Sequence, residues 1–247
     1  RDNNLKYYMV KGTLLGAVRN NGFIPWDLDS DFAMFRDDYE KFLILARNLK
    51  TSEYTLQHVG IDENCDITFV RLLVNKAKIR KSADTTRNMH LDIFVLDYLE
   101  SENRITEFIK EKIVLFLGYV QSYRVNKWSV KGKNSWWKNL LIKAGALITR
   151  NFNGENFDKL TRKIAGCKYQ KNDYAAILNS RYGYSKEKYK CEDFSDAIEL
   201  EFEGHKFFAP IGYHEILKKT YGDYMKLPPK NKRYPAYFES AEVLLEQ

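Results

Sequence analysis

Three aspartates alternate with other residues in WDLDSDF, residues 26–32, which leads directly into apolar sequence. Successive side chains of an extended strand point to opposite faces of a sheet, so Asp27, Asp29 and Asp31 would share one face. Carboxylates held that close together raise one another's pKa and repel unless a cation lies between them. The segment therefore predicts a strand that presents carboxylates to a divalent cation.

A fourth aspartate lies in a second strand-like run. Asp92 falls within HLDIFVLD, residues 90–97, where an isolated charge would be unfavourable, and His90 would face the same side. Mg²⁺ prefers oxygen ligands and commonly uses one or two carboxylates together with water and substrate phosphates. The two acidic segments therefore predict a site for Mg²⁺ (or Mn²⁺) built from strand aspartates. The alternative is a solvated acidic face.

The order of the segments predicts an α+β (α/β-like) fold. Residues 5–10 favour a strand, Gly12 favours a tight turn, and a short helix should begin near Thr13. A glycine turn followed by strand aspartates is typical of nucleotidyltransferase-fold enzymes, so we expect a mixed β-sheet catalytic core flanked by helices. Further strands are predicted at residues 54–59, 67–74, 77–80 and 90–99, and helices at 36–50, 106–123, 135–149 and 156–166.

The whole chain, residues 1–247, is expected to form a single nucleotidyltransferase-like catalytic domain. Within it, residues 101–170 predict a basic, aromatic helical insertion. The C-terminal part predicts a hairpin that turns at Gly204–His205, a helix from Tyr213 and an ordered loop. Helices and strands are thus expected on both sides of the insertion.

Charge and cysteine content narrow the cellular setting. The chain has 40 Lys and Arg against 33 Asp and Glu, a net charge of +7 that favours an anionic substrate without identifying a partner. Cys65, Cys167 and Cys191 form no C-x-x-C pair, which favours a reducing compartment. We expect a cytoplasmic protein, with the inner face of a bacterial membrane as a further option. Because the sequence begins at Arg1, a preceding targeting segment stays open.

Three segments resemble the LicD family of phosphotransferases, which includes phosphocholine transferases of bacterial surface glycans and, more distantly, fukutin-related protein. They are KGTLLGAVRNNGFIPWDLDSDFAMFRDDYEKF, HLDIFVLD and YGDYMKLPP, in the family's order. The resemblance implies a nucleotidyltransferase-like fold and transfer of a phospho-alcohol from a cytidine-diphosphate donor to a sugar hydroxyl. By position it assigns the metal to Asp29 and Asp31, with Asp92 as a third carboxylate. Leu28 and Ser30 depart from the residues that many relatives carry there, which affects the choice of donor.

Residues near the aspartates are expected to bind substrate. Gly12 and Thr13 lie at a predicted helix start, where N–H groups and the helix dipole favour a phosphate, and Lys11 adds positive charge; an ordinary strand-to-helix turn is the alternative. Arg71 interrupts an apolar run and needs a partner if its strand is buried. Further candidates are Arg19, Arg71 and Arg87 as phosphate clamps and Trp26 as a stacking residue.

Residues 112–153 contain no aspartate or glutamate. They carry eight of the chain's basic residues and three tryptophans: Lys112, Arg124, Lys127, Lys131, Lys133, Lys138, Lys143, Arg150, Trp128, Trp136 and Trp137. Such a stretch suits an anionic membrane surface; an anionic glycan, a nucleic acid, or a helical lid with inward tryptophans are alternatives. We expect peripheral membrane contact through this segment and no nucleic-acid partner. The family resemblance implies a lipid-linked glycan acceptor.

Together these features predict a metal-dependent phosphotransferase. It would move phosphocholine, or a similar phospho-alcohol, from a CDP-alcohol donor, with CDP-choline favoured, to a sugar hydroxyl of a cell-surface glycan or teichoic acid precursor. Asp92 would complete the metal coordination or accept the proton of the attacking hydroxyl. The alternatives are a ribitol- or glycerol-phosphate transferase of the same fold and a non-catalytic module that binds an anionic polymer.

Overall fold

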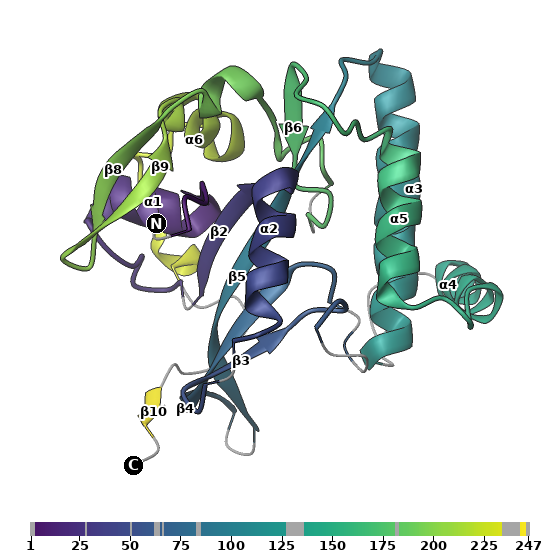
Figure 1. The fold of residues 1–247 in the computed structure, drawn as a ribbon, viewed down its shortest axis with the longest axis horizontal. Coiled ribbons are helices and arrows are strands. Elements are labelled where there is room, and N and C mark those ends of the chain that lie inside the picture. Colours follow the sequence, from purple (N-terminus) through teal and green to yellow (C-terminus); the bar gives the residue numbers. More distant parts are fainter. Residues whose placement is uncertain are drawn as a thin grey trace. The chain divides into compact units, whose positions relative to one another are not determined.

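A computed structural model describes residues 3–27, 29–49, 51–61, 65, 67–82, 85–126, 136–180, 183–233 and 243–245 (Figure 1). The chain divides into two compact units. The first comprises Arg1–Gln57, Phe69–Val95 and Lys190–Gln247, and the second comprises His58–Thr68 and Leu96–Tyr189. Both contain helices and strands, which confirms the predicted α+β class.

A twisted sheet forms the centre of the first unit. Its strands run in the order β1 (Tyr8–Met9), β2 (Ser30–Phe35), β5 (Thr85–Leu99), β4 (Val70–Ser82) and β10 (Val243–Leu245), and β3 (Tyr54–Gln57) also pairs with β4. β4 and β5 are antiparallel, and their register places Arg71 directly opposite Asp92. β2 lies next to β5, so the two predicted acidic segments occupy neighbouring strands.

One face of this sheet forms the apolar core of the first unit. Helix α2 (Arg36–Ala46) packs Tyr39 and Phe42 against Val70 and Val95, which come from β4 and β5. Residues on either side of Val70 and Val95 in sequence point to the other face, because side chains alternate along a strand. The alternate positions, including Arg71 and Asp92, therefore lie on the face of the sheet opposite the apolar core.

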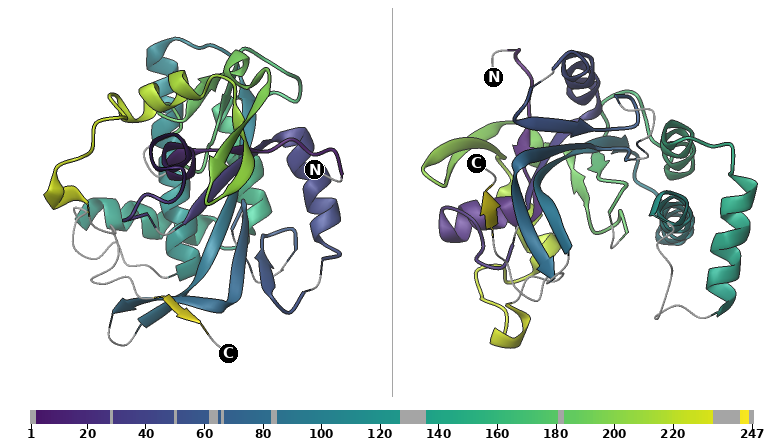
Figure 2. Two further views of the ribbon diagram at one scale, coloured as in Figure 1. Left: turned by 90° about the vertical axis from the view of Figure 1, so that its left-hand side faces the viewer. Right: turned by 90° about the horizontal axis from the view of Figure 1, so that it is seen from below.

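The remaining elements of the first unit are helix α1 (Lys11–Asn20), the short helices η1 (Cys191–Phe194) and η2 (Lys230–Lys232), the hairpin strands β8 (Ala197–Phe202) and β9 (His205–Pro210), and helix α6 (Tyr213–Tyr221). The left panel of Figure 2 shows this hairpin beside α1. Its turn consists of Glu203 and Gly204, which have φ angles of 52° and 75°. The predicted hairpin is confirmed, with the turn one residue earlier, because two residues of positive φ match the twist of the strands.

The described residues of the second unit form helices α3 (Arg104–Asn126), α4 (Trp136–Ile148) and α5 (Gly154–Ala165) and short strands β6 (Tyr174–Ala176) and β7 (Lys188–Lys190). α3 and α5 pack through Leu117, Val120 and Phe157, while α4 runs across them (Figure 2, right). β6 pairs with the end of β5, where Leu99 lies opposite Tyr174. The helices fall within the predicted insertion, whereas the single-domain assignment stays a prediction. No helix within the described ranges is long and apolar enough to cross a membrane.

Candidate active site

The start of helix α1 holds Asp31 in place on β2. The backbone N–H of Asp31 donates to Thr13 Oγ1 at 2.7 Å, and its carbonyl accepts from Val10 N–H at 3.1 Å. Thr13 is buried. Val10 precedes helix α1 and Thr13 lies in its first turn, so both sides of the helix start are hydrogen-bonded to one residue of β2. The Thr13 hydroxyl therefore positions Asp31, a role that we had not predicted for it.

Asp31 lies within the electrostatic influence of the other predicted carboxylates. Burial raises the pKa of Asp31 to about 8; the positive charge of Lys11 opposes this shift, and the charges of Asp29, Asp92 and Asp27 add to it. These influences require the side chains to be close to one another, since Coulomb interactions fall with distance. The structure thus brings the two predicted acidic segments together at one place.

Gly12 matters for a reason different from the predicted turn. Helix α1 already begins at Lys11, which has a φ angle of 52°, so the turn lies one residue earlier than expected. A Cβ on Gly12 would lie 1.9 Å from Asp27 Oδ2, which no side chain could occupy without displacing the carboxylate. The glycine therefore allows Asp27 to lie against the helix start.

Arg71 and Asp92 form a bidentate ion pair across β4 and β5. Nε and Nη2 of Arg71 each donate to one oxygen of Asp92, both at 2.7 Å. Burial lowers the pKa of Arg71, but the hydrogen bonds and charge of Asp92, together with Asp29 and Asp31, raise it overall. The expected partner of Arg71 is thereby identified. The pair also fixes the orientation of Asp92, whose side chain is only 6% exposed.

Two further side chains on β5 complete this face. His90 Nε2 lies 4.0 Å from Asp29 Oδ2, so His90 does face the carboxylates. Lys11 Nζ lies 3.3 Å from the centroid of the Phe94 ring, and Phe94 contacts Phe69 with a centroid distance of 4.8 Å. We had not predicted a role for Phe94. The alternation of His90, Asp92 and Phe94 along one strand is the signal that would have found it.

The other predicted substrate-binding residues are not brought to the carboxylates by a described contact. Arg19 lies in the last turn of α1, roughly 10 Å along the helix from Gly12, and donates to Asn20 and to the carbonyl of Tyr224. Trp26 lies in the turn before Asp27. The side chain of Arg87, in β5, lies outside the described part of the structure.

The arrangement can hold a cation through few protein ligands. Within the described ranges, no three His, Cys, Asp or Glu side chains are grouped closely enough to bind a metal by themselves. Both Asp92 oxygens accept hydrogen bonds from Arg71, whereas the Asp29 side chain is 43% exposed. Asp29 and Asp31 therefore remain the carboxylates best suited to a metal whose other ligands are water and phosphate oxygens.

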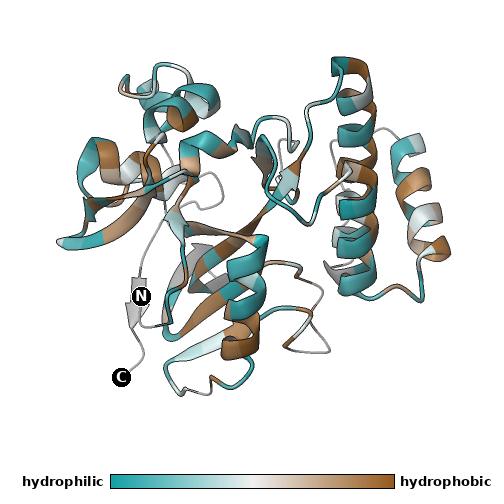
Figure 3. Cartoon of the chain, turned by 45° about the horizontal axis from the view of Figure 1, so that its top comes forward, coloured by the Kyte–Doolittle hydropathy of each residue, from teal (hydrophilic) through white to brown (hydrophobic). Residues whose placement is uncertain are grey.

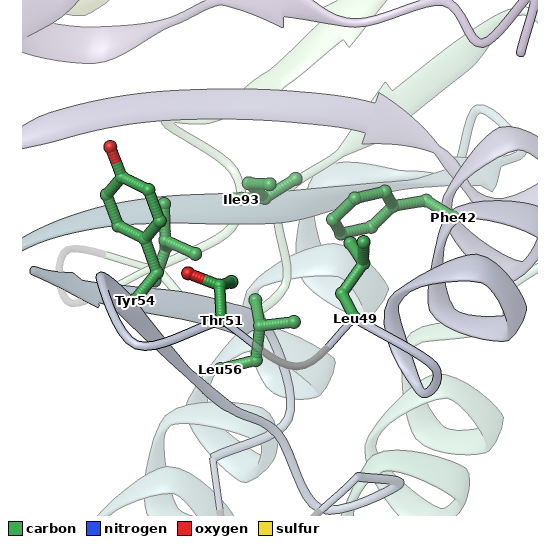
Figure 4. A pocket seen from close by; sticks show the side chains of 7 residues that line it. Phe42, Leu49, Thr51, Tyr54, Leu56 and Ile93 are labelled. Carbon is green, nitrogen blue, oxygen red and sulfur yellow. The ribbon is translucent and has the colours of Figure 1, made fainter.

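An apolar pocket of about 270 Å³ lies on the opposite face of the same sheet (Figure 4). Phe42, Leu49, Thr51, Tyr54, Leu56, Leu72 and Ile93 line it. Ile93 and Leu72 neighbour Asp92 and Arg71 in sequence and point away from them. None of the described residues that line the pocket is charged, so the acidic face is the better candidate for phosphate chemistry.

The fold and the site described above define a mixed α+β protein with acidic side chains gathered around Asp31. Residues 4–131 match the family described as LicD/FKTN/FKRP, nucleotidyltransferase domain. Lipopolysaccharide cholinephosphotransferase LicD of Haemophilus influenzae is 33% identical over 97% of this chain and 89% of its own length. The chain therefore belongs to the LicD family.

Shorter similarities were found in Rickettsia. An uncharacterized protein of Rickettsia typhi is 41% identical over 26% of this chain and 20% of its own length. One of Rickettsia prowazekii is 34% identical over 31% of this chain and 29% of its own length. These two similarities cover too little of either protein to support a shared activity.

Proposed function

We propose that this protein is a phosphotransferase that moves phosphocholine, or a similar phospho-alcohol, from a CDP-linked donor to a sugar hydroxyl of a glycan. The observation that carries the proposal is the clustering of Asp27, Asp29 and Asp92 around the partly buried Asp31, where their charges add to the effect of burial in raising the pKa of Asp31. A relative that matches nearly the whole chain is named a lipopolysaccharide cholinephosphotransferase. The name supports the group transferred and the class of acceptor.

The acidic face fits a divalent cation. Like charges beside a partly buried carboxylate are unfavourable unless a cation compensates them, and carboxylate oxygens are the ligands that Mg²⁺ prefers. Asp29 and Asp31 would hold Mg²⁺ (or Mn²⁺). Such an ion would supply positive charge to the donor diphosphate and to the leaving phosphate. The proposal therefore includes both a requirement for a divalent metal and the assignment of Asp29 and Asp31 as its ligands.

The chain's own residues have distinct tasks in the proposed reaction. The sugar oxygen forms a bond to the phosphorus of the phospho-alcohol, the bond from that phosphorus to the bridging anhydride oxygen breaks, and CMP leaves with both bonding electrons. Lys11 and Arg71 face the developing negative charge, which is the main contribution that a protein makes to phosphoryl transfer. Arg71 has five N–H donors and uses two on Asp92, so others can bind phosphate oxygens.

The proton of the sugar hydroxyl needs an acceptor. Asp92 is one candidate, since Arg71 holds its carboxylate in a fixed orientation. The alternative is that Asp92 only completes the metal coordination, as Asp29 and Asp31 would. A general base must lie within hydrogen-bond reach of the proton that it accepts. Comparison of Asp92→Asn with Asp29→Asn, each assayed across a pH series, would separate the two roles.

The test is a transfer assay with defined donors. Purified protein is incubated with CDP-choline, CDP-ribitol or CDP-glycerol, with and without Mg²⁺ or Mn²⁺, and with a bacterial glycan acceptor; CMP release and acceptor mass are measured. We expect release of CMP with CDP-choline only when metal and acceptor are present. A preference for CDP-ribitol or CDP-glycerol would replace the donor in the proposal. Absence of transfer with all three donors and both metals would contradict it.

A binding measurement complements the assay. Thermal unfolding is followed with cytidine diphosphates, each with and without the metal, because a ligand that binds the native state raises the melting temperature. We expect the donor and metal together to stabilise the protein more than the sum of their separate effects. Asp29→Asn should remove this effect, whereas Asp37→Asn, at an exposed position in the first turn of α2, should retain it.

A further inference from the structure

Helix α4 presents an apolar surface to solvent. Its exposed large apolar side chains are Trp136, Trp137, Leu140, Leu141, Leu147 and Ile148. Trp136 is 78% exposed and Ile148 is 81% exposed. At 3.6 residues per turn, these positions fall within an arc of roughly 140° around the helix. They therefore form one continuous face, called here the α4 outer face, and Figure 3 shows the hydrophobic bands along this helix.

The opposite side of α4 packs against α3, so α4 cannot rotate to bury its outer face there. Ile142 is buried, and a Cβ on Gly145 would lie 2.8 Å from Val120 Cγ2 and 3.3 Å from Phe116 Cζ. The glycine thus permits close approach of the two helices. Ala146 joins the same apolar cluster. Because this packing sets the rotation of α4, exposure of the outer face is a property of the folded unit.

Positive charge flanks the α4 outer face. Lys138 and Lys143 are exposed and lie on opposite edges of its apolar arc. Residues 112–153 contain no acidic residue, so no carboxylate from this stretch neutralises them. Lysines at the edge of an apolar face can extend their ammonium groups toward anionic headgroups while their stems stay in apolar surroundings.

We propose that α4 docks on an anionic lipid membrane, lying in the plane of the interface with its outer face inserted. Tryptophans prefer the membrane–water interface, and each basic residue near an anionic surface strengthens binding. With 13 residues, α4 is roughly 20 Å long, less than the ~20 residues that a spanning helix needs. The proposal does not depend on the proposed transferase activity.

The chemistry of this face favours lipid over a second protein. Protein interfaces are depleted of lysine, and the rim around their apolar centre is polar. Here the flanking charges have one sign, and two adjacent tryptophans lie at the end of the helix. A basic helix with tryptophan and leucine on its apolar face is typical of peripheral membrane contact. A second copy of this chain would bring the same positive charge and would be repelled.

The first measurement is vesicle binding. The protein is mixed with phosphatidylcholine vesicles that contain none or an equal share of phosphatidylglycerol, and bound protein is separated by sedimentation. We expect binding to anionic vesicles that is at least ~10-fold tighter than binding to neutral vesicles and that weakens in high salt. Tryptophan emission should shift to shorter wavelength on binding, and Trp136→Phe with Trp137→Phe should remove most of that shift.

Matched variants assign the effect to α4. Leu140→Asn with Leu147→Asn should weaken vesicle binding at least ~10-fold, because two apolar side chains no longer insert. Ile44→Asn with Leu49→Asn changes two comparably exposed side chains in the first unit and should change binding less than ~2-fold. Lys138→Gln with Lys143→Gln should weaken vesicle binding ~10-fold or more. Lys41→Gln with Lys159→Gln changes the net charge by the same amount away from α4 and should change vesicle binding little.

Three results would overturn the proposal. The first is no saturable binding to anionic vesicles. The second is equal loss of binding in the α4 variants and their matched controls. The third is a dimer, measured by light scattering without lipid, that Leu140→Asn with Leu147→Asn converts to monomer, since a second copy would then occupy the α4 outer face. The lysine variants keep the test valid if the leucine variants unfold, as a circular dichroism melt would reveal.

Discussion

Three carboxylates lie within electrostatic reach of the partly buried Asp31, whereas along α4 six large apolar side chains face solvent. The first region concentrates like charge where burial makes charge unfavourable. The second exposes apolar surface that a folded protein would ordinarily bury. In both regions neighbouring residues hold the unfavourable groups in place: Thr13 and Arg71 in the first, Ile142 and Gly145 in the second. Local rules of folding are broken most often where a protein binds something else.

The largest expected effect concerns the acidic region alone. Asp31→Asn should reduce CMP release from CDP-choline by at least ~10³-fold, because a cation ligand and a negative charge disappear from the reacting centre. Vesicle binding should be unchanged, as α4 is not altered. Initial rates and vesicle sedimentation on the same preparation check both expectations. Asp37→Asn serves as the control with unchanged activity. Loss of both properties in Asp31→Asn would mean that the variant has unfolded or that the two regions do not act separately.

The next effect is on stability and concerns the ion pair between β4 and β5. Arg71→Ala should lower the free energy of unfolding by about 3–5 kcal/mol, because Asp92 would remain buried without its partner. Arg71→Leu with Asp92→Leu should recover much of that loss, since well-packed apolar residues often replace a buried pair without penalty. Urea unfolding of the single and double variants tests this. A double variant as unstable as Arg71→Ala would show that packing, not the uncompensated charge, determines the loss.

A smaller effect follows from the raised pKa of Asp31. Its carboxyl titrates at about 8 in the folded chain, well above the ~3.9 of an unfolded aspartate. Between these values the folded state binds more protons, so stability contributed by the protonated carboxyl is present at low pH and is lost as pH rises toward 8. In metal-free buffer this group should therefore remove ~3–4 kcal/mol of stability from pH 5 to pH 8, which lowers the melting temperature by roughly 7–15 °C.

Two comparisons isolate that dependence. Asp31→Asn should show a flatter profile of melting temperature against pH, whereas Asp37→Asn should follow the unmodified chain. Addition of Mg²⁺ should stabilise the unmodified chain more at pH 8 than at pH 5, because the ionised carboxylate is then available. Parallel pH profiles for the unmodified chain and Asp31→Asn would contradict the assignment of the shift to this residue.

The sequence predicted which side chains form the acidic region better than it predicted their geometry. The spacing of the aspartates was sufficient to predict that Asp29, Asp31 and Asp92 lie together, although Asp29 precedes β2, and Arg71 was recognised as needing a partner. Which residue pairs with Arg71 depends on the register of β4 and β5, which contains irregularities between Leu73 and Lys78 that no periodicity reveals. Register between distant strands is decided by tertiary packing rather than by local preference.

Two details escaped prediction, one because it depends on a local backbone contact and one because it depends on helix packing. β2 begins at Ser30 rather than at Asp27, since Asp27 N–H donates to Ile24 O at 2.8 Å in a turn. In the basic segment, helix α4 was expected, but inward tryptophans were among the alternatives. The exposure of Trp136 and Trp137 contradicts that alternative for these two residues, whereas Trp128 lies outside the described residues. The side of a helix that is buried depends on its neighbour, here α3.

The smallest effects come from adding a single methyl group. Each region has its own glycine, Gly12 beside the aspartates and Gly145 in α4, so each region can be tested separately. Gly12→Ala would place a Cβ 1.9 Å from Asp27 Oδ2, so the carboxylate must move. We expect a loss of transfer activity of about 10-fold or more with little change in stability, since a flexible side chain can shift and alanine favours a helix by ~1 kcal/mol. Vesicle binding should stay the same.

Gly145→Ala should have the opposite pattern. Its Cβ would lie 2.8 Å from Val120 Cγ2, and overpacking of this kind destabilises a core by about 1–3 kcal/mol, which outweighs the helix preference of alanine. α4 should then pack less firmly on α3, and vesicle binding should change while CMP release does not. Gly118→Ala in α3 is the matched control: its Cβ meets nothing within 4 Å, so it should stabilise the protein by ~0.5–1 kcal/mol. If Gly145→Ala stabilised the protein as Gly118→Ala does, α4 would not be held against α3 as described, and its outward-facing side would lose its structural basis.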